Sequence, residues 1–188
     1  MASAIILAAG GSRRMGEPKA LLSIGEKCLV ERHIEVLFEQ CSRVVVVGGA
    51  LRQSLEDICR RTGAQFVHNS DWETTMPIDS LRCVLALNLP GPWVVTPVDA
   101  PPVLVEDLSN LVNCKTSAVL AYQGRSGHPV LLAQSEIARL PKALHLREIL
   151  GDSDQVPSQN PDCLLNINHP EQWASWLDSY LGRAKKTP

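Results

Sequence analysis

The chain has 188 residues, of which 45% are hydrophobic and 20% charged, and its formal net charge at pH 7 is −2. This length suits one domain of ordinary size, so we expect a single domain over residues 1–188. The composition is typical of a soluble globular protein and argues against disordered and membrane classes. The near-neutral charge argues against a nucleic-acid partner, and any anion site must therefore be local.

The N-terminal residues show no pattern of export or membrane insertion. Met1–Ala4 lacks the basic region of a secretory signal, and the apolar stretch that follows ends at Gly10, which is too short to span a bilayer. We therefore expect a cytoplasmic protein without a membrane partner. The six cysteines are scattered, with no CxxC pair and no zinc-ligand spacing, so we expect reduced thiols.

Apolar, β-branched runs alternate with helical patterns along most of the chain, which predicts an α/β fold. The expected strands are residues 4–7, 43–47, 65–68, 93–98, 118–122, 128–132 and 164–167. Residues 44–47 are all valine, which is typical of a parallel strand covered by helices on both faces. Two close runs around residues 124–127 indicate a hairpin. We therefore predict a doubly wound, mostly parallel but mixed sheet in a three-layer αβα arrangement.

Apolar spacing also predicts the helices. Two helical faces are expected, one with Leu29, His33, Leu37 and Cys41 and one with Leu51, Leu55, Ile58 and Cys59, the second capped by Gly63. Further helices are expected over residues 80–87 and 104–112, and the polar segment 151–161 predicts a surface loop. The C-terminal segment 170–182 carries an apolar stripe, Trp173, Trp176, Leu177, Tyr180 and Leu181. This stripe predicts a helix packed on the domain, with a homodimer contact as the alternative; we expect a monomer or a weak homodimer.

The loop after the first expected strand carries the clearest functional pattern. Residues 7–22 read LAAGGSRRMGEPKALL, which fits neither the dinucleotide fingerprint GxGxxG nor a Walker A loop, because Lys19 arrives three residues late and no Ser or Thr follows it. Glycines let backbone N–H groups approach phosphate oxygens, while Arg14 and Lys19 can neutralise charge on a departing pyrophosphate. The loop predicts a triphosphate site; the alternative is a glycine-rich turn with solvated cations.

This stretch resembles the signature LAAGxSxRMGxxKxLL of the MobA-like nucleoside triphosphate transferases. Weaker matches follow in order: Asn69, Trp72, Ser80-Leu81, VTPVDAPPV (95–103), GHPVLL (127–132) and NINHPEQW (166–173). The resemblance covers about residues 4–180. It implies a Rossmann-like fold of the nucleotide-diphospho-sugar transferase type and a Mg²⁺-dependent nucleotidyltransferase.

The resemblance also implies site residues. The expected nucleotide-binding residues are Leu7, Ala8, Ala9, Gly10, Gly11, Ser12, Arg13, Arg14, Lys19, Asn69 and Ser80. Lys19, Arg14 and Asp99 are the expected catalytic residues, and Asp99 would hold Mg²⁺, although a turn-capping role is the alternative. Asn168 matches the second metal contact, with a helix N-cap as the alternative. His128 would lie on the acceptor side, and a structural histidine is an equal alternative.

The expected reaction moves a nucleoside monophosphate from a triphosphate to a phosphorylated acceptor, with release of pyrophosphate. A phosphate monoester has its second pKa at about 6, so the attacking oxygen is already ionised and no strong base is needed. Within the family, LAAG and EPK resemble the cytidylyltransferases and NIN resembles the guanylyltransferases, so the resemblance implies CTP narrowly ahead of GTP. Between Trp72 and Ser80 the chain reads ETTMPID, where relatives carry glycine and a small polar residue, which puts base recognition in doubt.

The signature and the chain length favour a molybdopterin-type acceptor. Two alternatives stay open, a sugar-phosphate nucleotidyltransferase and a nucleotide-binding regulatory protein without turnover. The second is conceivable because Asn168 is neutral and Thr74-Thr75 departs from the family pattern. A P-loop hydrolase is disfavoured because the Lys-Ser/Thr pair is missing.

Overall fold

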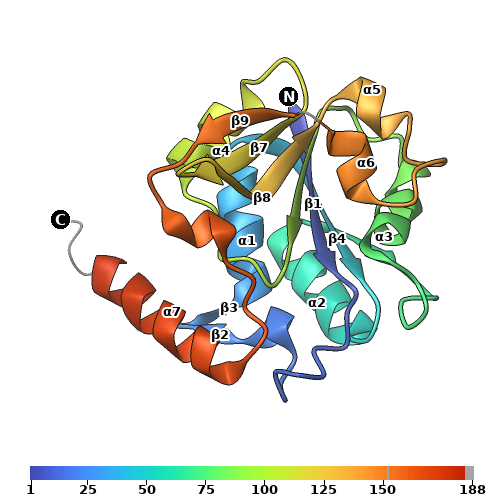
Figure 1. Cartoon of the computed structure of the whole chain (residues 1–188). Helices are drawn as coiled ribbons and strands as arrows, with labels where there is room; N and C mark the ends of the chain where they lie inside the picture. Colours follow the sequence, from blue (N-terminus) through green and yellow to red (C-terminus); the bar gives the residue numbers. More distant parts are fainter. Residues whose placement is uncertain (152, 185–188) are drawn as a thin grey trace.

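The computed structural model describes residues 1–151 and 153–184 (Figure 1). Seven strands form one sheet in the order β5-β4-β1-β6-β8-β7-β9. Their bounds are β1 (Ala2–Ala8), β4 (Cys41–Gly48), β5 (Gln65–His68), β6 (Trp93–Pro97), β7 (Ala118–Tyr122), β8 (Arg125–Leu132) and β9 (Asp154–Pro157). Only the pairings of β8 with β6 and β7 are antiparallel, so the sheet of the described residues is mixed and mostly parallel, as predicted.

Helices cover both faces of this sheet. They are α1 (Leu29–Phe38), α2 (Arg52–Thr62), α3 (Pro77–Leu85), α4 (Val105–Val112), α5 (Gln134–Ile137), α6 (Leu146–Leu150) and α7 (Pro170–Ala184). Successive side chains of a strand point to opposite faces. Ile6 of β1 accordingly packs in a core with α1, α2 and α4, while Ile5 packs in a second core with α3, α5 and α6. The three-layer αβα arrangement is confirmed. None of the described helices is both long and apolar enough to cross a membrane.

The chain order of the strands fixes where a ligand can bind. From β1 the chain moves outward to β4 and β5, then returns to place β6 on the other side of β1. The carboxyl ends of β1 and β6 therefore lie at a topological switch point, the usual ligand position in open α/β sheets. Val98 extends this pairing, because its N–H donates to the carbonyl of Leu7 at 3.0 Å.

Two predictions about the C-terminal third were wrong. Residues 164–167 are not a strand: Asn160 caps a 3₁₀ turn, η2 (Pro161–Leu164), and residues 165–167 have no regular structure. A strand, β9, lies instead inside the predicted loop 151–161, where Val156 pairs with Leu120. Only one of the four β9 side chains is buried, so this edge strand lacks an apolar pattern. Residue 152 of that loop and residues 185–188 of the predicted domain lie outside the described residues.

Boundaries in the N-terminal half differ more mildly. The helix predicted to include Cys41 ends at Phe38, and Cys41 begins β4. Gly63 has a φ of +79° and ends α2, as predicted. The helix expected over residues 80–87 begins earlier, at Pro77, because proline is well suited to the first helical position.

The C-terminal helix α7 packs on the rest of the chain. Trp176 is buried in a third cluster with Met15, Leu22 and Ile24 of the N-terminal loop and hairpin and with Leu29 of α1. That hairpin consists of β2 (Ser23–Ile24) and β3 (Lys27–Cys28), and Figure 1 shows α7 lying beside it. Of the predicted stripe, Leu181 stays exposed. Packing of α7 places its first turn close to the glycine-rich loop.

Candidate active site

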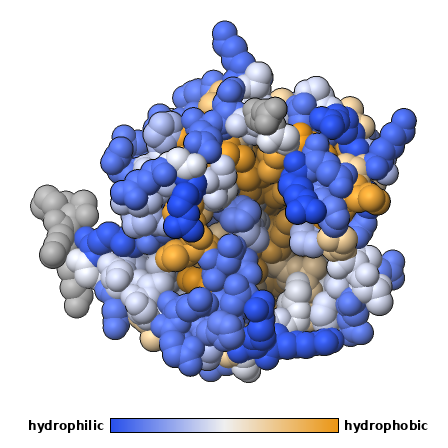
Figure 2. Space-filling model, in the orientation of Figure 1, coloured by the Kyte–Doolittle hydropathy of each residue, from blue (hydrophilic) through white to orange (hydrophobic). Residues whose placement is uncertain are grey.

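A pocket of about 380 Å³ opens at the switch point between β1 and β6, a size suited to a small molecule. Its lining combines the glycine-rich loop, the segment 69–80 and the residues after β6. Eight predicted site residues line it: Leu7, Ala9, Gly10, Ser12, Lys19, Asn69, Ser80 and Asp99. Figure 2 shows this side of the molecule hollowed at its centre, with hydrophobic residues between hydrophilic rims. The sequence pattern therefore located the pocket.

The glycine-rich loop turns back on itself and brings Lys19 into the pocket. Ser12 has a positive φ of 51°, its carbonyl accepts the N–H of Met15 at 3.0 Å, and its Oγ accepts the N–H of Lys19 at 3.0 Å. Gly16 has a φ of +77°, a conformation that glycine adopts without strain. Lys19 then begins the short 3₁₀ turn η1 (Lys19–Leu21).

Trp72 is packed against the loops that follow β1 and β4. At Gly49 a side-chain carbon would lie 2.4 Å from the Trp72 ring and 2.6 Å from the carbonyl oxygen of Ala9, so only glycine fits. The N–H of Ala50 donates to the same carbonyl at 3.3 Å. The Trp72 ring thus fixes one wall of the pocket relative to the phosphate-type loop.

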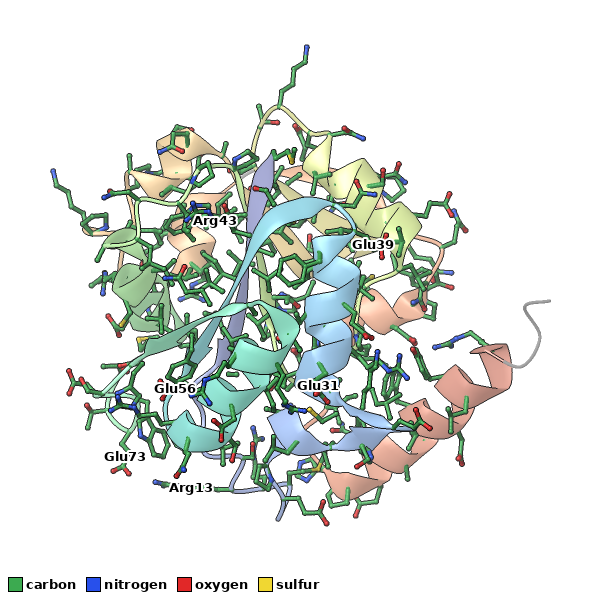
Figure 3. All side chains as sticks on the ribbon, turned by 180° about the vertical axis from the view of Figure 1, so that it is seen from behind. Arg13, Glu31, Glu39, Arg43, Glu56 and Glu73 are labelled. Carbon is green, nitrogen blue, oxygen red and sulfur yellow. The ribbon has the colours of Figure 1, made fainter. Side chains whose placement is uncertain are left out.

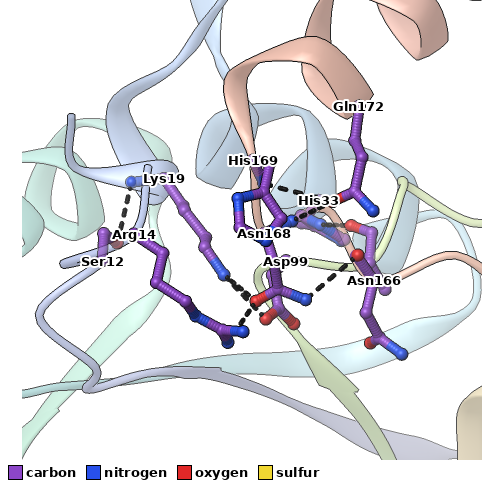
Figure 4. A network of polar contacts seen from close by, with 10 residues as sticks. Ser12, Arg14, Lys19, His33, Asp99, Asn166, Asn168, His169 and Gln172 are labelled. Carbon is purple, nitrogen blue, oxygen red and sulfur yellow. Dashed lines mark hydrogen bonds and ion pairs between the residues drawn. The ribbon is translucent and has the colours of Figure 1, made fainter. Parts of the chain in front are cut away.

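Four predicted residues from three distant segments meet at the rim of the pocket (Figure 4). Lys19 Nζ donates to Asp99 Oδ2 at 3.0 Å and to Asn168 Oδ1 at 2.8 Å. Arg14 donates to the same Asn168 oxygen at 3.0 Å. Lys19 therefore contacts both of the expected metal-binding oxygens, and Arg14 contacts one of them. The segments that supply them follow β1, follow β6 and precede α7.

Asp99 is held in place through its neighbouring backbone. The N–H of Ile167 donates to the Asp99 carbonyl at 2.7 Å, and His33 Nε2 lies 2.9 Å from the carbonyl of Ala100. His33 comes from α1 and is fully buried, and desolvation lowers its pKa to about 4, so the ring is neutral and Nε2 donates. Sequence reasoning placed His33 only on a helical face; a histidine within an otherwise apolar face was the available signal.

The side-chain amide of Asn69 forms its hydrogen bonds with other residues of the chain. Its Nδ2 donates to Ser80 Oγ at 3.1 Å and to Thr75 Oγ1 at 3.0 Å, and its Oδ1 accepts the N–H of Asp71 at 3.1 Å. Each hydroxyl accepts from Asn69 and keeps its own proton to donate. Thr75 and Ser80 both line the pocket, so two hydroxyl groups that can donate lie beside the space for a ligand. Thr75 was not among the predicted site residues, although it lies in the departing segment ETTMPID.

Four of the expected nucleotide-binding residues do not line the pocket: Arg14, which lies at its rim, and Ala8, Gly11 and Arg13. Ala8 is buried in the core with α1 and α2. Gly11 and Arg13 are exposed, and Figure 3 shows Arg13 pointing outward at the edge of the molecule. Any contact of Ala8 or Gly11 with a nucleotide would thus involve the backbone.

His128 lies behind the loop that follows Asp99. It lines a separate cavity of about 10 Å³ with Pro101 and Pro102, and its Nδ1 has no hydrogen-bond partner within the described residues. Burial lowers the pKa of His128, and the nearby Asp99 carboxylate opposes that shift. The structure thus brings His128 near Asp99 but not into the main pocket.

The donor set at the rim fits a metal shared with a phosphate ligand. Asp99 Oδ2 and Asn168 Oδ1 already converge on one cationic atom, Lys19 Nζ. Mg²⁺ prefers such oxygen ligands, and it needs only one or two from protein when phosphates and water complete its shell. In residues 1–151 and 153–184, no group of three or more His, Cys, Asp or Glu residues could form a complete metal cage. A ligand-completed site is therefore the kind that fits.

Comparison with known proteins shows the family of the chain. Residues 4–156 match the MobA-like NTP transferase domain. The chain belongs to this family. It is 22% identical to the molybdenum cofactor cytidylyltransferase of Escherichia coli (strain K12), over 94% of this chain and 95% of the relative. It is 29% identical to the molybdenum cofactor guanylyltransferase of Vibrio campbellii (strain ATCC BAA-1116), over 92% and 93%.

Solved structures share the fold of this MobA-like chain. A nucleotidyl transferase from Methanothermobacter thermautotroptrophicus superposes with a TM-score of 0.81 at 22% identity, covering 97% of this chain and 99% of the other. Rv0371C from Mycobacterium tuberculosis H37Rv, solved in complex with manganese, gives 0.76 at 17% identity, covering 94% and 97%. Family, relatives and fold together identify a nucleotidyltransferase with a Rossmann-like fold.

Proposed function

We propose that this nucleotidyltransferase transfers a nucleoside monophosphate, CMP in the first place, from a triphosphate to a molybdopterin-type phosphorylated acceptor with Mg²⁺. The observation that carries the proposal is the convergence of Lys19, Arg14, Asp99 and Asn168 at the rim of a pocket at the switch point. The names of the relatives support the acceptor class. We further propose that residues 1–188 form one nucleotidyltransferase domain that needs no nucleic acid or membrane partner.

The chain's own residues would act by position and charge. The backbone of residues 7–12 would lie along the triphosphate, and Lys19 and Arg14 would neutralise charge that develops on pyrophosphate as it leaves. The acceptor phosphate is ionised above its second pKa of about 6, so alignment of two anions is the main task. Lys19 is suited to this role because its main chain is fixed by Ser12 while its ammonium group faces the pocket.

Asp99 and Asn168 would hold the divalent cation, which supplies positive charge to the triphosphate when bound. Lys19 Nζ now lies at the point on which both oxygens converge. Lys19 would exchange these oxygens for phosphate oxygens on nucleotide binding. This exchange keeps both the carboxylate and the ammonium paired with an opposite charge, and so avoids a desolvated, unpaired ion.

The preference for CTP is supported by the two hydroxyls that Asn69 orients. Thr75 and Ser80 line the pocket, and each hydroxyl would donate its proton to the base, because its oxygen already accepts from Asn69. Cytosine offers two adjacent acceptors, O2 and N3, whereas the pairing edge of guanine offers two donors and one acceptor. Two donors therefore suit cytosine better. GTP is the second candidate, because the relative with 29% identity is a guanylyltransferase.

We place the acceptor on the side of Asp99 that faces His128. The small cavity beside His128 is lined by Pro101 and Pro102 of the loop after Asp99, so His128 contacts the segment that carries the metal-binding carboxylate. Its unpartnered Nδ1 is buried, and the small cavity has room for no more than one water, so His128 would act on the acceptor only through the loop after Asp99.

The deciding experiment measures pyrophosphate release from each of the four nucleoside triphosphates with Mg²⁺. Each reaction is run without acceptor, with a molybdopterin-type acceptor and with a panel of sugar 1-phosphates. Release with CTP that depends on the molybdopterin-type acceptor is expected. Release only with sugar 1-phosphates would move the protein to the sugar-phosphate nucleotidyltransferases, and nucleotide binding without any release would favour a regulatory role.

A further inference from the structure

The first turn of α7 bonds to the backbone of the residue whose side chain gathers the two cations. Gln172 Oε1 accepts the N–H of Asn168 at 2.8 Å and the N–H of His169 at 3.1 Å. Figure 4 shows Gln172 approaching from the helix, on the side of Asn168 away from Lys19 and Arg14. One exposed glutamine thus anchors the segment that enters the site.

Asn168 is fixed on its other sides as well. Its Nδ2 donates to the carbonyl of Asn166 at 3.1 Å, and the preceding residue, Ile167, donates to the Asp99 carbonyl at 2.7 Å. With backbone and amide nitrogen both held, the Oδ1 atom has a defined position. That oxygen accepts from Lys19 and from Arg14, which uses both of its lone pairs.

Gln172 makes one more backbone hydrogen bond than an ordinary helix cap requires. A residue at the third helical position commonly bonds the N–H of the cap residue, here His169. Gln172 Oε1 also takes the N–H one residue earlier, that of Asn168. Within the described residues, its side chain does not bond Lys19, Arg14 or Asp99 directly, so any influence on these groups passes through Asn168.

We propose that Gln172 is a positioning residue for phosphate binding: it holds Asn168 so that Asn168 Oδ1 is in place for Lys19 and Arg14 in the free chain and for the divalent cation once the phosphates bind. This inference rests on the proposed function for the identity of the ligand. It adds a role for a residue on α7 that does not line the pocket. Groups that hold a ligand-binding side chain in this way typically matter for affinity and rate although they never touch the substrate.

The test compares three variants of the full chain, Gln172→Ala, Gln172→Glu and Glu171→Ala. Binding of inorganic pyrophosphate with Mg²⁺ is measured by calorimetry, and kcat and KM are measured for CTP. We expect Gln172→Ala to weaken pyrophosphate binding about tenfold and to raise the KM for CTP similarly, as for other residues that orient a binding group. Gln172→Glu replaces the amide oxygen by a carboxylate oxygen that can accept both N–H groups, and binding should stay within about twofold of the unaltered chain.

Glu171→Ala is the matched control. Glu171 lies in the same exposed first turn and stabilises the helix dipole, but makes no side-chain hydrogen bond within the described chain. The near-ultraviolet circular dichroism of the four tryptophans, to which the rings of Trp173 and Trp176 with centroids 5.2 Å apart contribute, checks that α7 stays packed. We expect this signal to be the same in all variants.

Four outcomes would overturn the inference: unaltered binding in Gln172→Ala, equal weakening in Gln172→Glu, equal weakening in Glu171→Ala, or no pyrophosphate binding by the unaltered chain. Loss of the tryptophan signal in Gln172→Ala but not in Gln172→Glu would also overturn it, because the defect would then be one of helix packing. Absence of nucleotidyl transfer, with pyrophosphate binding that follows the expected pattern, would overturn the proposed function alone.

Discussion

Lys19 and Asp99 form an ion pair with 3.0 Å between Nζ and Oδ2, although they lie 80 residues apart. Their side chains are 11% and 27% exposed, so both atoms are partly shielded from water. Such a pair contributes little to stability, since its Coulomb energy is offset by desolvation. Its position at the carboxyl ends of two adjacent parallel strands is what ligand binding requires.

Replacing the lysine should therefore separate function from folding. We expect Lys19→Ala to lower kcat/KM for pyrophosphate release by about two to three orders of magnitude, because a preorganised positive charge at the leaving group is lost. The free energy of unfolding should change by about 1 kcal/mol or less. Steady-state kinetics and urea denaturation measure the two quantities. Lys27→Ala removes a cation paired with Glu35 outside the pocket and is the matched control; equal losses in both variants would contradict the role of Lys19.

Asp99→Asn should act on the metal rather than on the nucleotide alone. The amide keeps the shape of the side chain but removes the one carboxylate charge in the pair of expected metal-binding oxygens. We expect the Mg²⁺ concentration for half-maximal activity to rise about tenfold or more, because Mg²⁺ favours charged oxygen ligands. Asp57→Asn, on the exposed face of α2, should leave that concentration unchanged. A loss of activity that extra Mg²⁺ does not alter would count against a metal role.

Thr75→Val tests the base preference. The substitution keeps the β-branched shape and removes the hydroxyl group of a residue that lines the pocket. We expect the KM for CTP to rise about tenfold, corresponding to one lost hydrogen bond of ordinary strength, with a smaller change for GTP. Thr74→Val removes an exposed hydroxyl that bonds the carbonyl of Asp71 and does not line the pocket. A larger effect on GTP than on CTP would reverse the proposed order of the two nucleotides.

The sequence contained enough information to predict the centre of the fold and of the site. The run of valines in residues 44–47 forms the middle of β4, because apolar β-branched residues on both faces suit a strand between helical layers. Lys19 and Asp99 follow two such strands, and strand ends that face one way converge at one edge of the sheet. For these strands, the local sequence pattern and the sheet topology predict the same fold and the same position of the site.

Residues whose role depends on distant partners could not be read from a local pattern. His33 reaches the carbonyl of Ala100 from α1, and the local bond of Gln172 to Asn168 gains its role only because Asn168 meets Lys19 and Arg14. The edge strand β9 was hidden because only Val156 of its four side chains is buried. In each case tertiary contacts, rather than periodicity, decide what the residue does.

Because His33 is buried, we expect the free energy of unfolding to fall as the pH is lowered. Desolvation lowers its pKa from the ordinary 6.5 to about 4, so below pH 6.5 the unfolded chain binds a proton that the folded chain does not. The stabilisation is complete above pH 6.5 and is lost as the pH falls toward 4. Between pH 7 and pH 5 the free energy of unfolding should fall by about 2 kcal/mol on account of this one residue.

His33→Gln isolates that contribution, because the amide nitrogen can still donate to the Ala100 carbonyl but does not titrate. Urea denaturation at pH 7, 6 and 5 should give a shallower slope of unfolding free energy against pH in His33→Gln, by about 2 kcal/mol across the range. The buried His128, whose pKa is also lowered, contributes a slope of the same sign to both proteins and cancels in the comparison. Equal slopes would mean that His33 is protonated to the same extent in the folded and unfolded chains, and the ring would then not be the neutral donor that holds the loop after Asp99.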